Sequence, residues 1–354
     1  MYKNNIEQIM IDMHDVAACF KPSHFWQMGA EKLQQDLQSK GMENFRRFPS
    51  ALGYFVPTYQ FSGWINQPDK YQHLLSENQA TLVDDNKAWL NMQAFLSGKM
   101  QAESDYRVYK ASESALLPNT AAFSESAVGA PVEQFEFEQR VFSRSSLNYL
   151  MGINFLKQHL LADEQIKNVL EIGGGFGSLG EILLSDAAND CFYLNVDIPP
   201  TCLFSSYYLQ QVFGEQLVAD YLDSKRFTNL SIEGMRVTHK AAVLCPWQLS
   251  EVSGTIDLFV NFISFQEMEP DIVQNYLNEV ERLQAKYVLL RNLKEGKQIA
   301  KSAGDVGVKT PILGDDYDGF LPNYDLVACN VFPFGYKTID GFHSELRLYR
   351  RKSI

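Results

Sequence analysis

The chain has few cysteines, no long apolar run and no excess of positive charge. Its five cysteines form no CxxC pair, which argues against a disulfide framework and against the usual ligand spacing of a zinc site. No stretch reaches the about 20 apolar residues that a membrane-spanning helix needs. The net charge of −12 disfavours nucleic acid as a partner, because binding to phosphates depends mainly on Lys and Arg.

The first residues also lack the features of a targeting segment. They mix polar, acidic and apolar side chains, unlike a signal or transit peptide, so we expect a cytoplasmic protein without a membrane segment. Most of the cysteines lie in apolar runs, and we expect them to be small buried residues. The one basic run, from Arg347 to Lys352, is expected to be an edge strand followed by a solvated tail.

What is present suggests two domains. The 354 residues are 45% hydrophobic, enough for a large core and typical of about two domains. Residues 1–135 are predicted to form a mostly helical domain, with helices over 23–41 and 85–96. An aromatic segment rich in Pro and Gly, residues 45–64, lies between these helices and is expected to be an ordered loop.

Residues 136–354 show a different pattern, in which short apolar runs alternate with amphipathic ones. A helix over 140–161 is expected to come first. Strands alternating with helices indicate βαβ units and a mainly parallel sheet. Two strands without a helix between them follow at the end and predict an antiparallel pair that closes the sheet. The expected strands cover residues 169–172, 192–197, 242–244, 256–262, 287–290, 324–334 and 345–350.

The most informative segment is VLEIGGGFGSLG at residues 169–180, where a buried strand meets a helix. Glycines at this point let the backbone turn tightly and approach a ligand. The N–H groups at the start of the helix favour a polar or negative ligand. Asp197 ends the next strand, and an acid there can accept hydrogen bonds from both ribose hydroxyls of a bound nucleoside.

Two cofactors fit this arrangement. Residues 175–180 match GxGxxG, the dinucleotide signature, with Asp197 near the expected distance. Residues 171–177 match ExGxGxG, a pattern that resembles motif I of Rossmann-like S-adenosylmethionine methyltransferases. The Glu171 carboxylate would repel a pyrophosphate, whereas S-adenosylmethionine carries an ammonium and a sulfonium group. The pattern therefore favours S-adenosylmethionine over a nicotinamide dinucleotide.

The chain as a whole resembles a bacterial family of sugar O-methyltransferases, within the Rossmann-like S-adenosylmethionine-dependent methyltransferases. The resemblance covers most of the chain. It rests on PSHFWQMGAEKLQQDLQSKGMENF (22–45), SRSSLNYL (143–150), VLEIGGGFGSLGEILL (169–184), YLNVDIPPTCLFSSYYL (193–209) and NFISFQEM (261–268). It implies a methyl-transferring enzyme whose acceptor is a hydroxyl of a sugar or glycan precursor. A methyltransferase acting on another small-molecule hydroxyl or amine, an NAD(P)-dependent oxidoreductase, and a binding module without chemistry stay open as alternatives.

The fold and this resemblance imply a set of cofactor-binding residues. Asp197 should take the ribose hydroxyls, and Ile198 should pack against the adenine. Glu171 should help to place the methionine end, with the glycines beneath it. The segment after the third strand lacks the acid usual at the adenine edge, and Gln248 is the candidate replacement. The predicted cofactor set is Glu171, Gly173, Gly174, Gly175, Asp197, Ile198, Pro246, Trp247 and Asn261.

The catalytic candidates are Glu267, after the fourth strand, and His343, before the last strand. A sugar hydroxyl is weakly acidic, so a positioned base should accept its proton. The alternatives are a carboxylate that stabilises a helix N-terminus for Glu267 and a surface residue for His343. No metal site is predicted, because the acidic loop at 315–318 is expected to be a solvated turn. The helical N-terminal part is expected to be a lid over the acceptor or a surface for homo-oligomer formation.

Overall fold

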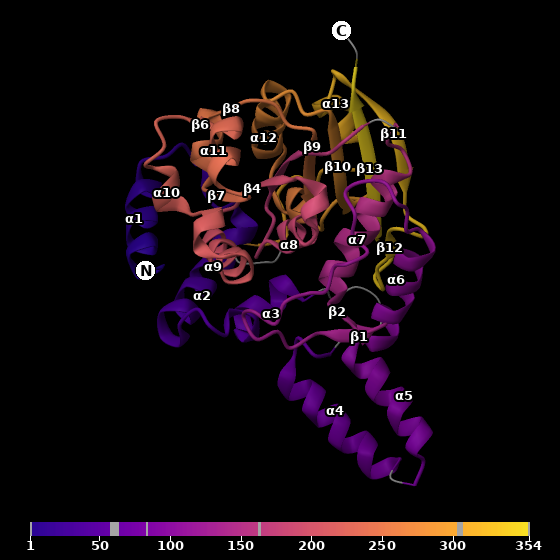
Figure 1. The fold of residues 1–354 in the computed structure, drawn as a ribbon. Coiled ribbons are helices and arrows are strands. Elements are labelled where there is room, and N and C mark those ends of the chain that lie inside the picture. The colour runs from indigo at the N-terminus through magenta and orange to yellow at the C-terminus, as the bar shows by residue number, and fades with distance from the viewer. Residues whose placement is uncertain (1, 57–63, 83, 162–163, 303–306, 353–354) are drawn as a thin grey trace.

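The computed structural model describes residues 2–56, 64–82, 84–161, 164–302 and 307–352. A mixed β-sheet forms its centre (Figure 1). Its strands, from one edge to the other, are β11 (Tyr324–Asn330), β13 (His343–Arg351), β10 (Tyr287–Leu293), β9 (Leu258–Phe262), β3 (Asn168–Ile172), β4 (Phe192–Val196), β7 (Ala241–Leu244) and β5 (Val218–Ala219), and β12 (Tyr336–Lys337) pairs with β13. Neighbouring strands are parallel except where they pair with β13, which runs antiparallel to β10, β11 and β12.

This sheet confirms the predicted α/β class, with a mainly parallel sheet closed by an antiparallel pair. The prediction for the basic run was wrong in one respect. Arg347 to Arg351 lie on β13, which is an interior strand because β10 and β11 pair with its two sides. Residues 344–349 are buried, and the Arg347 guanidinium is neutralised by Asp315, Asp318 and Glu345. The sheet edge on this side is β11.

Helices cover both faces of the sheet, and two hydrophobic clusters fill the space between the layers. One cluster includes residues of α7 (Arg144–Lys157), α8 (Ser178–Leu184) and α9 (Thr201–Phe213). The other includes residues of α11 (Ile232–Thr238), α12 (Pro270–Arg282) and α13 (Asp316–Phe320). Strands covered on both faces consist of nearly continuous apolar residues, which explains the apolar runs in the sequence. A short helix, α10 (Tyr221–Ser224), follows β5, and β6 (Leu230–Ser231) and β8 (Val252–Ser253) pair in a separate two-stranded sheet.

The N-terminal part is helical, as predicted. Its helices α4 (Pro68–Thr81) and α5 (Asn86–Ser97) project from the rest of the molecule (Figure 1). The predicted boundary at residue 135 falls inside strand β1, and one hydrophobic cluster contains residues from both sides of it, from Ile9 to Leu348. The elements are α1 (Tyr2–His14), α2 (His24–Lys40), α3 (Pro49–Phe55), α4 (Pro68–Thr81), α5 (Asn86–Ser97), α6 (Lys99–Ala111) and the hairpin of β1 (Phe135–Phe137) and β2 (Arg140–Phe142).

Two predicted elements have different limits in the structure. The helix expected over 140–161 begins only at Arg144, because Ser143 and Ser146 form a capping box and the residues before them form β2. The strand expected over 324–334 ends at Asn330, whose side-chain oxygen accepts the backbone N–H of Phe334 and turns the chain. Among the described helices, none has the length and apolar character required to cross a membrane.

The strand order places a topological switch point between β3 and β9. From β3 the chain continues to β4 on one side, and it later returns to β9 on the other side. In open α/β sheets, ligands bind in the crevice outside the carboxyl ends of the strands at such a point. Gly173 and Ile263 follow directly on β3 and β9, so the glycine loop and the segment around Glu267 lie on either side of this crevice.

Candidate active site

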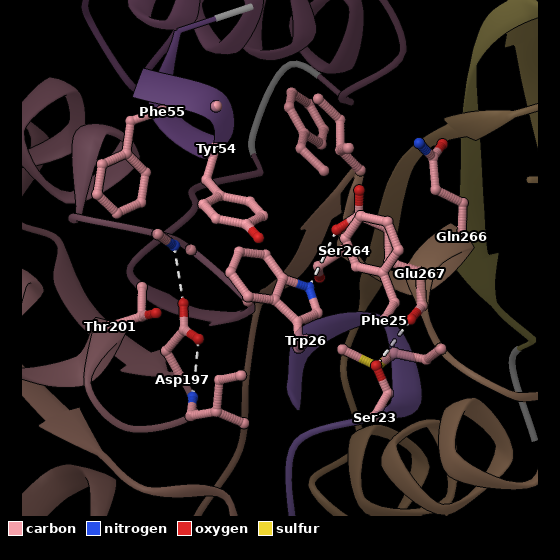
Figure 2. Close-up of a pocket in the computed structure, with 18 of the residues that line it drawn as sticks. Ser23, Phe25, Trp26, Tyr54, Phe55, Asp197, Thr201, Ser264, Gln266 and Glu267 are labelled. Carbon is pink, nitrogen blue, oxygen red and sulfur yellow. Dashed lines mark hydrogen bonds between the residues drawn. The ribbon is translucent and has the colours of Figure 1, made fainter. Parts of the chain in front are cut away.

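A cavity of about 1060 Å³ lies at this switch point. The glycine loop and the ends of β4, β9 and β10 form one part of its wall, and α2 and α3 of the N-terminal part form another. Its volume is at the upper end of the range for small-molecule sites, about 300–1,000 Å³. Figure 2 shows Asp197 and Glu267 in this cavity, with Trp26 and Tyr54 drawn between them in the view.

Glycine is required in the loop for space as well as for backbone conformation. Gly173 has φ +71°, and a Cβ atom at this residue would lie 2.1 Å from the Ser264 hydroxyl oxygen. A Cβ atom on Gly174 would lie 2.6 Å from side-chain oxygens of both Asn195 and Glu171. Gly173, Gly174 and Gly175 all line the cavity, so their backbone is open to close approach by a ligand.

Asp197 follows β4 and is buried at the cavity wall. Its carboxylate accepts the backbone N–H of Gly175 at 2.9 Å and that of Ile198 at 2.7 Å. Burial raises the pKa of Asp197 to about 8, although these two N–H groups act in the opposite direction. Ile198 also lines the cavity. Asp197, predicted to bind ribose, and Ile198, predicted to pack against the adenine, therefore both line the cavity.

Glu171 and Asn261 lie beneath the cavity and do not line it. Glu171 is fully buried, accepts a hydrogen bond from the Tyr193 hydroxyl, and has its pKa raised to about 7 by burial. The Asn261 amide donates to the Ile172 carbonyl at 2.9 Å and to the Ser264 hydroxyl at 2.6 Å. Both residues support the glycine loop from below, so any effect of theirs on a ligand passes through that loop.

The segment after β7 agrees only in part with the prediction. Pro246 lines the cavity, but Trp247 does not, and its indole donates to the Tyr221 hydroxyl at 3.2 Å. Gln248 accepts the Cys245 backbone N–H and donates to the Ser224 hydroxyl, so its amide is engaged in the core. Neither Trp247 nor Gln248 therefore reaches a ligand in this cavity.

Glu267 is buried at the cavity wall and connects three segments of the chain. One carboxylate oxygen accepts the Trp26 indole N–H at 3.0 Å, and the other accepts the Lys297 ammonium at 3.2 Å. Its backbone carbonyl accepts the Ser23 hydroxyl at 2.9 Å. Burial raises the pKa of Glu267, and Lys297 and Trp26 act in the opposite direction. Ile263 at the end of β9 has φ +76°, a strained conformation for a β-branched residue.

His343 is not brought into the site. It is the first residue of β13, and its ring nitrogen Nδ1 contacts the Glu295 carboxylate outside the set of cavity-lining residues. Its neighbours Phe342 and Ser344 do line the cavity, because successive residues of a strand point to opposite sides. The prediction of His343 as a base is corrected on this ground.

The acidic loop is engaged in ion pairs with a buried arginine. Asp315 and Asp318 both contact the Arg347 guanidinium. Among the residues that the structure describes, no group of three or more His, Cys, Asp or Glu side chains could hold a metal ion.

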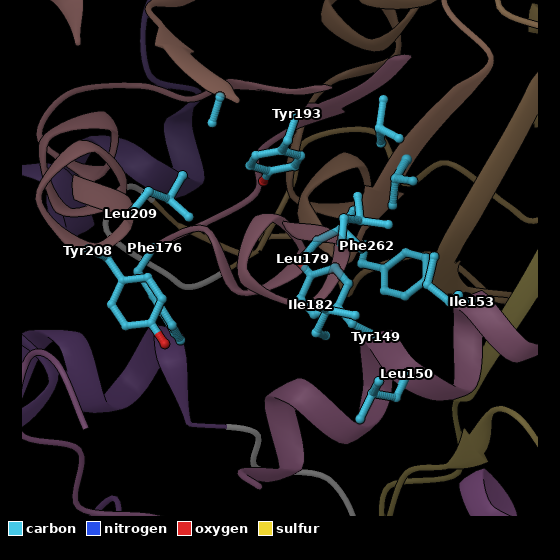
Figure 3. Close-up of a cluster of buried hydrophobic side chains, with 14 of the residues drawn as sticks. Tyr149, Leu150, Ile153, Phe176, Leu179, Ile182, Tyr193, Tyr208, Leu209 and Phe262 are labelled. Atoms are coloured by element: carbon cyan, nitrogen blue, oxygen red, sulfur yellow. The ribbon is translucent and has the colours of Figure 1, made fainter. Parts of the chain in front are cut away.

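Several cavity residues were missed by the sequence prediction. Ser178 starts α8 after β3 and Thr201 starts α9 after β4, and their hydroxyls are buried without a hydrogen-bond partner among the described residues. Tyr149 of α7 stacks on Phe262 of β9 with ring centroids 5.0 Å apart (Figure 3). The sequence signal for Ser178 and Thr201 was their place directly after the glycine loop and after DIPP. The remaining lining residues outside the prediction include Ser23, Phe25, Trp26, Tyr54, Phe55, Arg291 and Lys297.

No protein-family model and no curated protein sequence matches the chain. Among solved structures, the pyocyanin biosynthetic protein PhzM aligns at 11% identity over 59% of this chain and 56% of its own length, with a TM-score of 0.37. The mitomycin 7-O-methyltransferase MmcR aligns at 13% identity over 92% of this chain and 68% of its own, with a TM-score of 0.35. Magnesium protoporphyrin IX methyltransferase ChlM from Synechocystis, with bound SAH, aligns at 12% identity over 72% of this chain and 95% of its own, with a TM-score of 0.38.

The chain thus matches little more than half of the length of PhzM. At these identities and TM-scores, the neighbours assign no activity to it. The chain's own strand order establishes a Rossmann-like α/β fold with a large cavity at its topological switch point.

Proposed function

We propose that this chain is an S-adenosylmethionine-dependent methyltransferase. One observation carries the choice of cofactor: an acid, Glu171, lies against the glycine loop. The Glu171 carboxyl is packed under Gly174, and the Asp197 carboxyl accepts the N–H of Gly175. The Glu171 carboxylate would repel a diphosphate placed on this loop, whereas it would attract the ammonium and sulfonium of S-adenosylmethionine. Asp197 suits the ribose of either cofactor. This favours S-adenosylmethionine over NAD(P).

The residues at the cavity fit this cofactor. Asp197 can accept the two ribose hydroxyls, and the Ser178 and Thr201 hydroxyls are buried polar groups that a ligand would satisfy. Ile198 and Pro246 offer apolar contacts on the side where the adenine is expected. The glycine backbone leaves room for a close approach.

Glu267 is the proposed general base. When bound, S-adenosylmethionine supplies a methyl group on a positively charged sulfur. The part of this chain in the reaction is to orient the acceptor and to accept the proton that its hydroxyl loses as the new C–O bond forms. Glu267 lies in the cavity wall with both carboxylate oxygens fixed by N–H donors, and each oxygen keeps a lone pair for the acceptor hydroxyl.

For the acceptor we propose a hydroxyl of a sugar or glycan precursor. Aromatic rings of Phe25, Trp26 and Tyr54 line the cavity near Glu267, and flat apolar faces beside convergent polar groups suit a ring that carries several hydroxyls. A cationic amine is less suitable, because the Lys297 ammonium is 3.2 Å from the Glu267 carboxylate and would repel it.

The test is transfer of a radiolabelled methyl group. The purified chain is incubated with methyl-labelled S-adenosylmethionine and, in parallel, with free sugars, nucleotide sugars, phenols and amines. We expect label on a sugar hydroxyl, and we expect Glu267→Gln to lower turnover by about 10²- to 10⁴-fold while cofactor binding persists. The matched control is Glu251→Gln at an exposed position, which should leave turnover unchanged.

Two results would contradict parts of this proposal. Label that appears only on amines or phenols would reject the sugar acceptor and leave the methyltransferase intact. Full turnover in Glu267→Gln would reject Glu267 as the base.

A further inference from the structure

The start of helix α2 is connected to Glu267 by an unusual use of its N-cap residue. Ser23 occupies the N-cap position, but its side chain makes no capping hydrogen bond. Its hydroxyl donates instead to the backbone carbonyl of Glu267. A Ser side chain at this position normally stabilises a helix by about 1 kcal/mol through a bond to an N–H of the first turn. Here that bond is replaced by one that fixes the segment carrying Glu267.

Trp26, in the first turn of the same helix, fixes the side chain of Glu267. The Trp26 indole N–H lies 3.0 Å from one carboxylate oxygen. The indole ring is fixed in turn by Tyr54 of α3, with ring centroids 4.5 Å apart and planes inclined by 32°. The Tyr54 hydroxyl lies so close to Gly29 of α2 that a Cβ atom there would be 2.5 Å from it. The indole therefore has little freedom to turn away from the carboxylate.

Lys297, in the segment after β10, fixes the other carboxylate oxygen. Its ammonium lies 3.2 Å from that oxygen and 4.8 Å from the centre of the Phe25 ring, which is also at the start of α2. Its side chain is only 17% exposed, so the interaction is partly shielded from solvent. Lys297 thus closes a ring of contacts from α2 through Glu267 to the end of β10.

We infer that Trp26 and Lys297 are positioning residues for the Glu267 carboxylate, and that the N-terminal helices are part of the catalytic centre. This inference rests on the proposed function for the role of Glu267 as a base. A general base accepts a proton faster when its carboxylate already points toward the acceptor hydroxyl, so holding both oxygens in place before the acceptor binds should raise the rate. An ion pair exposed to solvent would do little to fix the carboxylate, but the pair of Lys297 and Glu267 is formed inside the cavity wall.

The arrangement has a consequence that is measurable without knowing the acceptor. Burial raises the pKa of Glu267, and the two N–H donors limit the rise. The other titratable group facing it is Tyr54, whose own pKa is raised by burial and by Glu267. Removing the charge of Lys297 should therefore raise the pKa of Glu267 further, and the Trp26 indole N–H should report the change.

The test is an NMR titration of the full chain with ¹⁵N-labelled indoles. The Trp26 resonance is assigned by its loss in Trp26→Phe and followed from pH 4 to pH 9. We expect it to titrate with a midpoint above the ordinary Glu value of about 4.3, and to become independent of pH in Glu267→Gln. In Lys297→Met the midpoint should rise further, because the positive charge that lowers the pKa of Glu267 is lost, and Lys297→Arg should restore it.

The matched control is Lys294→Met, which removes a lysine three residues away that is 3.8 Å from Glu345. It should leave the midpoint unchanged. A Trp26 resonance that does not titrate, or an equal shift in Lys297→Met and Lys294→Met, would overturn the inference. Titration of the same samples with S-adenosylhomocysteine keeps the two claims apart. If the wild-type chain does not bind S-adenosylhomocysteine, the proposed function is overturned. The indole titration would still decide whether Trp26 and Lys297 position the Glu267 carboxylate.

Discussion

At the scale of single residues, the lack of space around the glycine loop after β3 limits which side chains the sequence can carry there. Gly174 has an ordinary backbone conformation, so its importance is steric: no side-chain atom fits between it and the oxygens of Asn195 and Glu171. Gly319 in α13 is a suitable comparison, because a Cβ atom there would meet nothing within 4 Å. The two glycines separate the effect of crowding from the effect of an added methyl group.

We predict that Gly174→Ala lowers the free energy of unfolding by about 1–3 kcal/mol, because the added methyl group displaces buried polar side chains. It should also weaken binding of S-adenosylhomocysteine. Gly319→Ala, which adds a methyl group into free space inside a helix, should raise stability by up to about 1 kcal/mol. Denaturant unfolding and calorimetric titration of both variants measure these effects. Equal stability of the two variants would contradict the close packing around Gly174.

The residues of one local motif could be predicted from the sequence, and those that meet only in the fold could not. Gly173 to Gly175 and Asp197 belong to two adjacent strand ends with a recognisable spacing. Trp26 and Lys297 are separated from Glu267 by long stretches of chain, and no local pattern connects them. His343 was wrongly placed because the sequence does not show which of two neighbouring strand residues faces the cavity.

At the scale of elements, the hairpin of α4 and α5 differs from the helices around the sheet. No described side chain of α4 is buried, and Leu96 is the only buried one in α5. Almost every residue of α7 is buried. Since helices in proteins are stabilised mainly by packing of one face, α4 and α5 should be the least stable of these helices.

We predict that backbone amides of α4 and α5 exchange with solvent at least about 100-fold faster than those of α7, as measured by hydrogen–deuterium exchange with mass spectrometry. Similar exchange rates in the three helices, at a protein concentration where the chain is a monomer, would contradict this prediction. Protection that increases with protein concentration would support the expected homo-oligomer, with the hairpin covered by a second copy.

The sequence predicted the type of most elements and was weaker on their limits. The strands of the parallel sheet were recognised because they are buried on both faces and therefore consist of apolar runs. The start of α7 was missed because its capping box uses Ser146 in place of the usual Glu or Gln. The interior position of β13 was missed because its basic residues suggested an edge, whereas Arg347 is neutralised by acids around it.

At the scale of the whole molecule, buried acids give stability a dependence on pH, and besides Glu267 they include three others. Burial raises the pKa of Asp197 to about 8 and those of Glu171 and Glu181 to about 7. A carboxyl group with a higher pKa in the folded state binds more protons there than in the unfolded chain. The stability that such a carboxyl group contributes is fully present below its pKa in the unfolded chain, about 4, and is lost as the pH rises through its pKa in the folded state.

We predict that the free energy of unfolding falls as the pH rises from 5 to 8, by up to about 1.4 kcal/mol per pH unit for each of these acids. Glu181 accepts the Ser126 backbone N–H through one carboxylate oxygen and the Tyr208 hydroxyl through the other. In Glu181→Gln the amide oxygen can keep the bond from Ser126 and the amide NH₂ can donate to the Tyr208 oxygen, so the variant should fold and should reduce the slope. Urea unfolding at several pH values measures the slope. The control Glu251→Gln should leave it unchanged, and a wild-type stability that rises over this range would contradict the account.

The central claim is the cofactor, and calorimetric titration with S-adenosylhomocysteine and, separately, with NADH tests it most directly. We predict micromolar binding of S-adenosylhomocysteine, no binding of NADH, and at least about tenfold weaker binding of S-adenosylhomocysteine in Asp197→Ala, because the hydrogen bonds from the two ribose hydroxyls to this side chain are lost. Glu251→Gln should bind as the wild type does. Binding of NADH without binding of S-adenosylhomocysteine would contradict the account and assign the glycine loop to a dinucleotide.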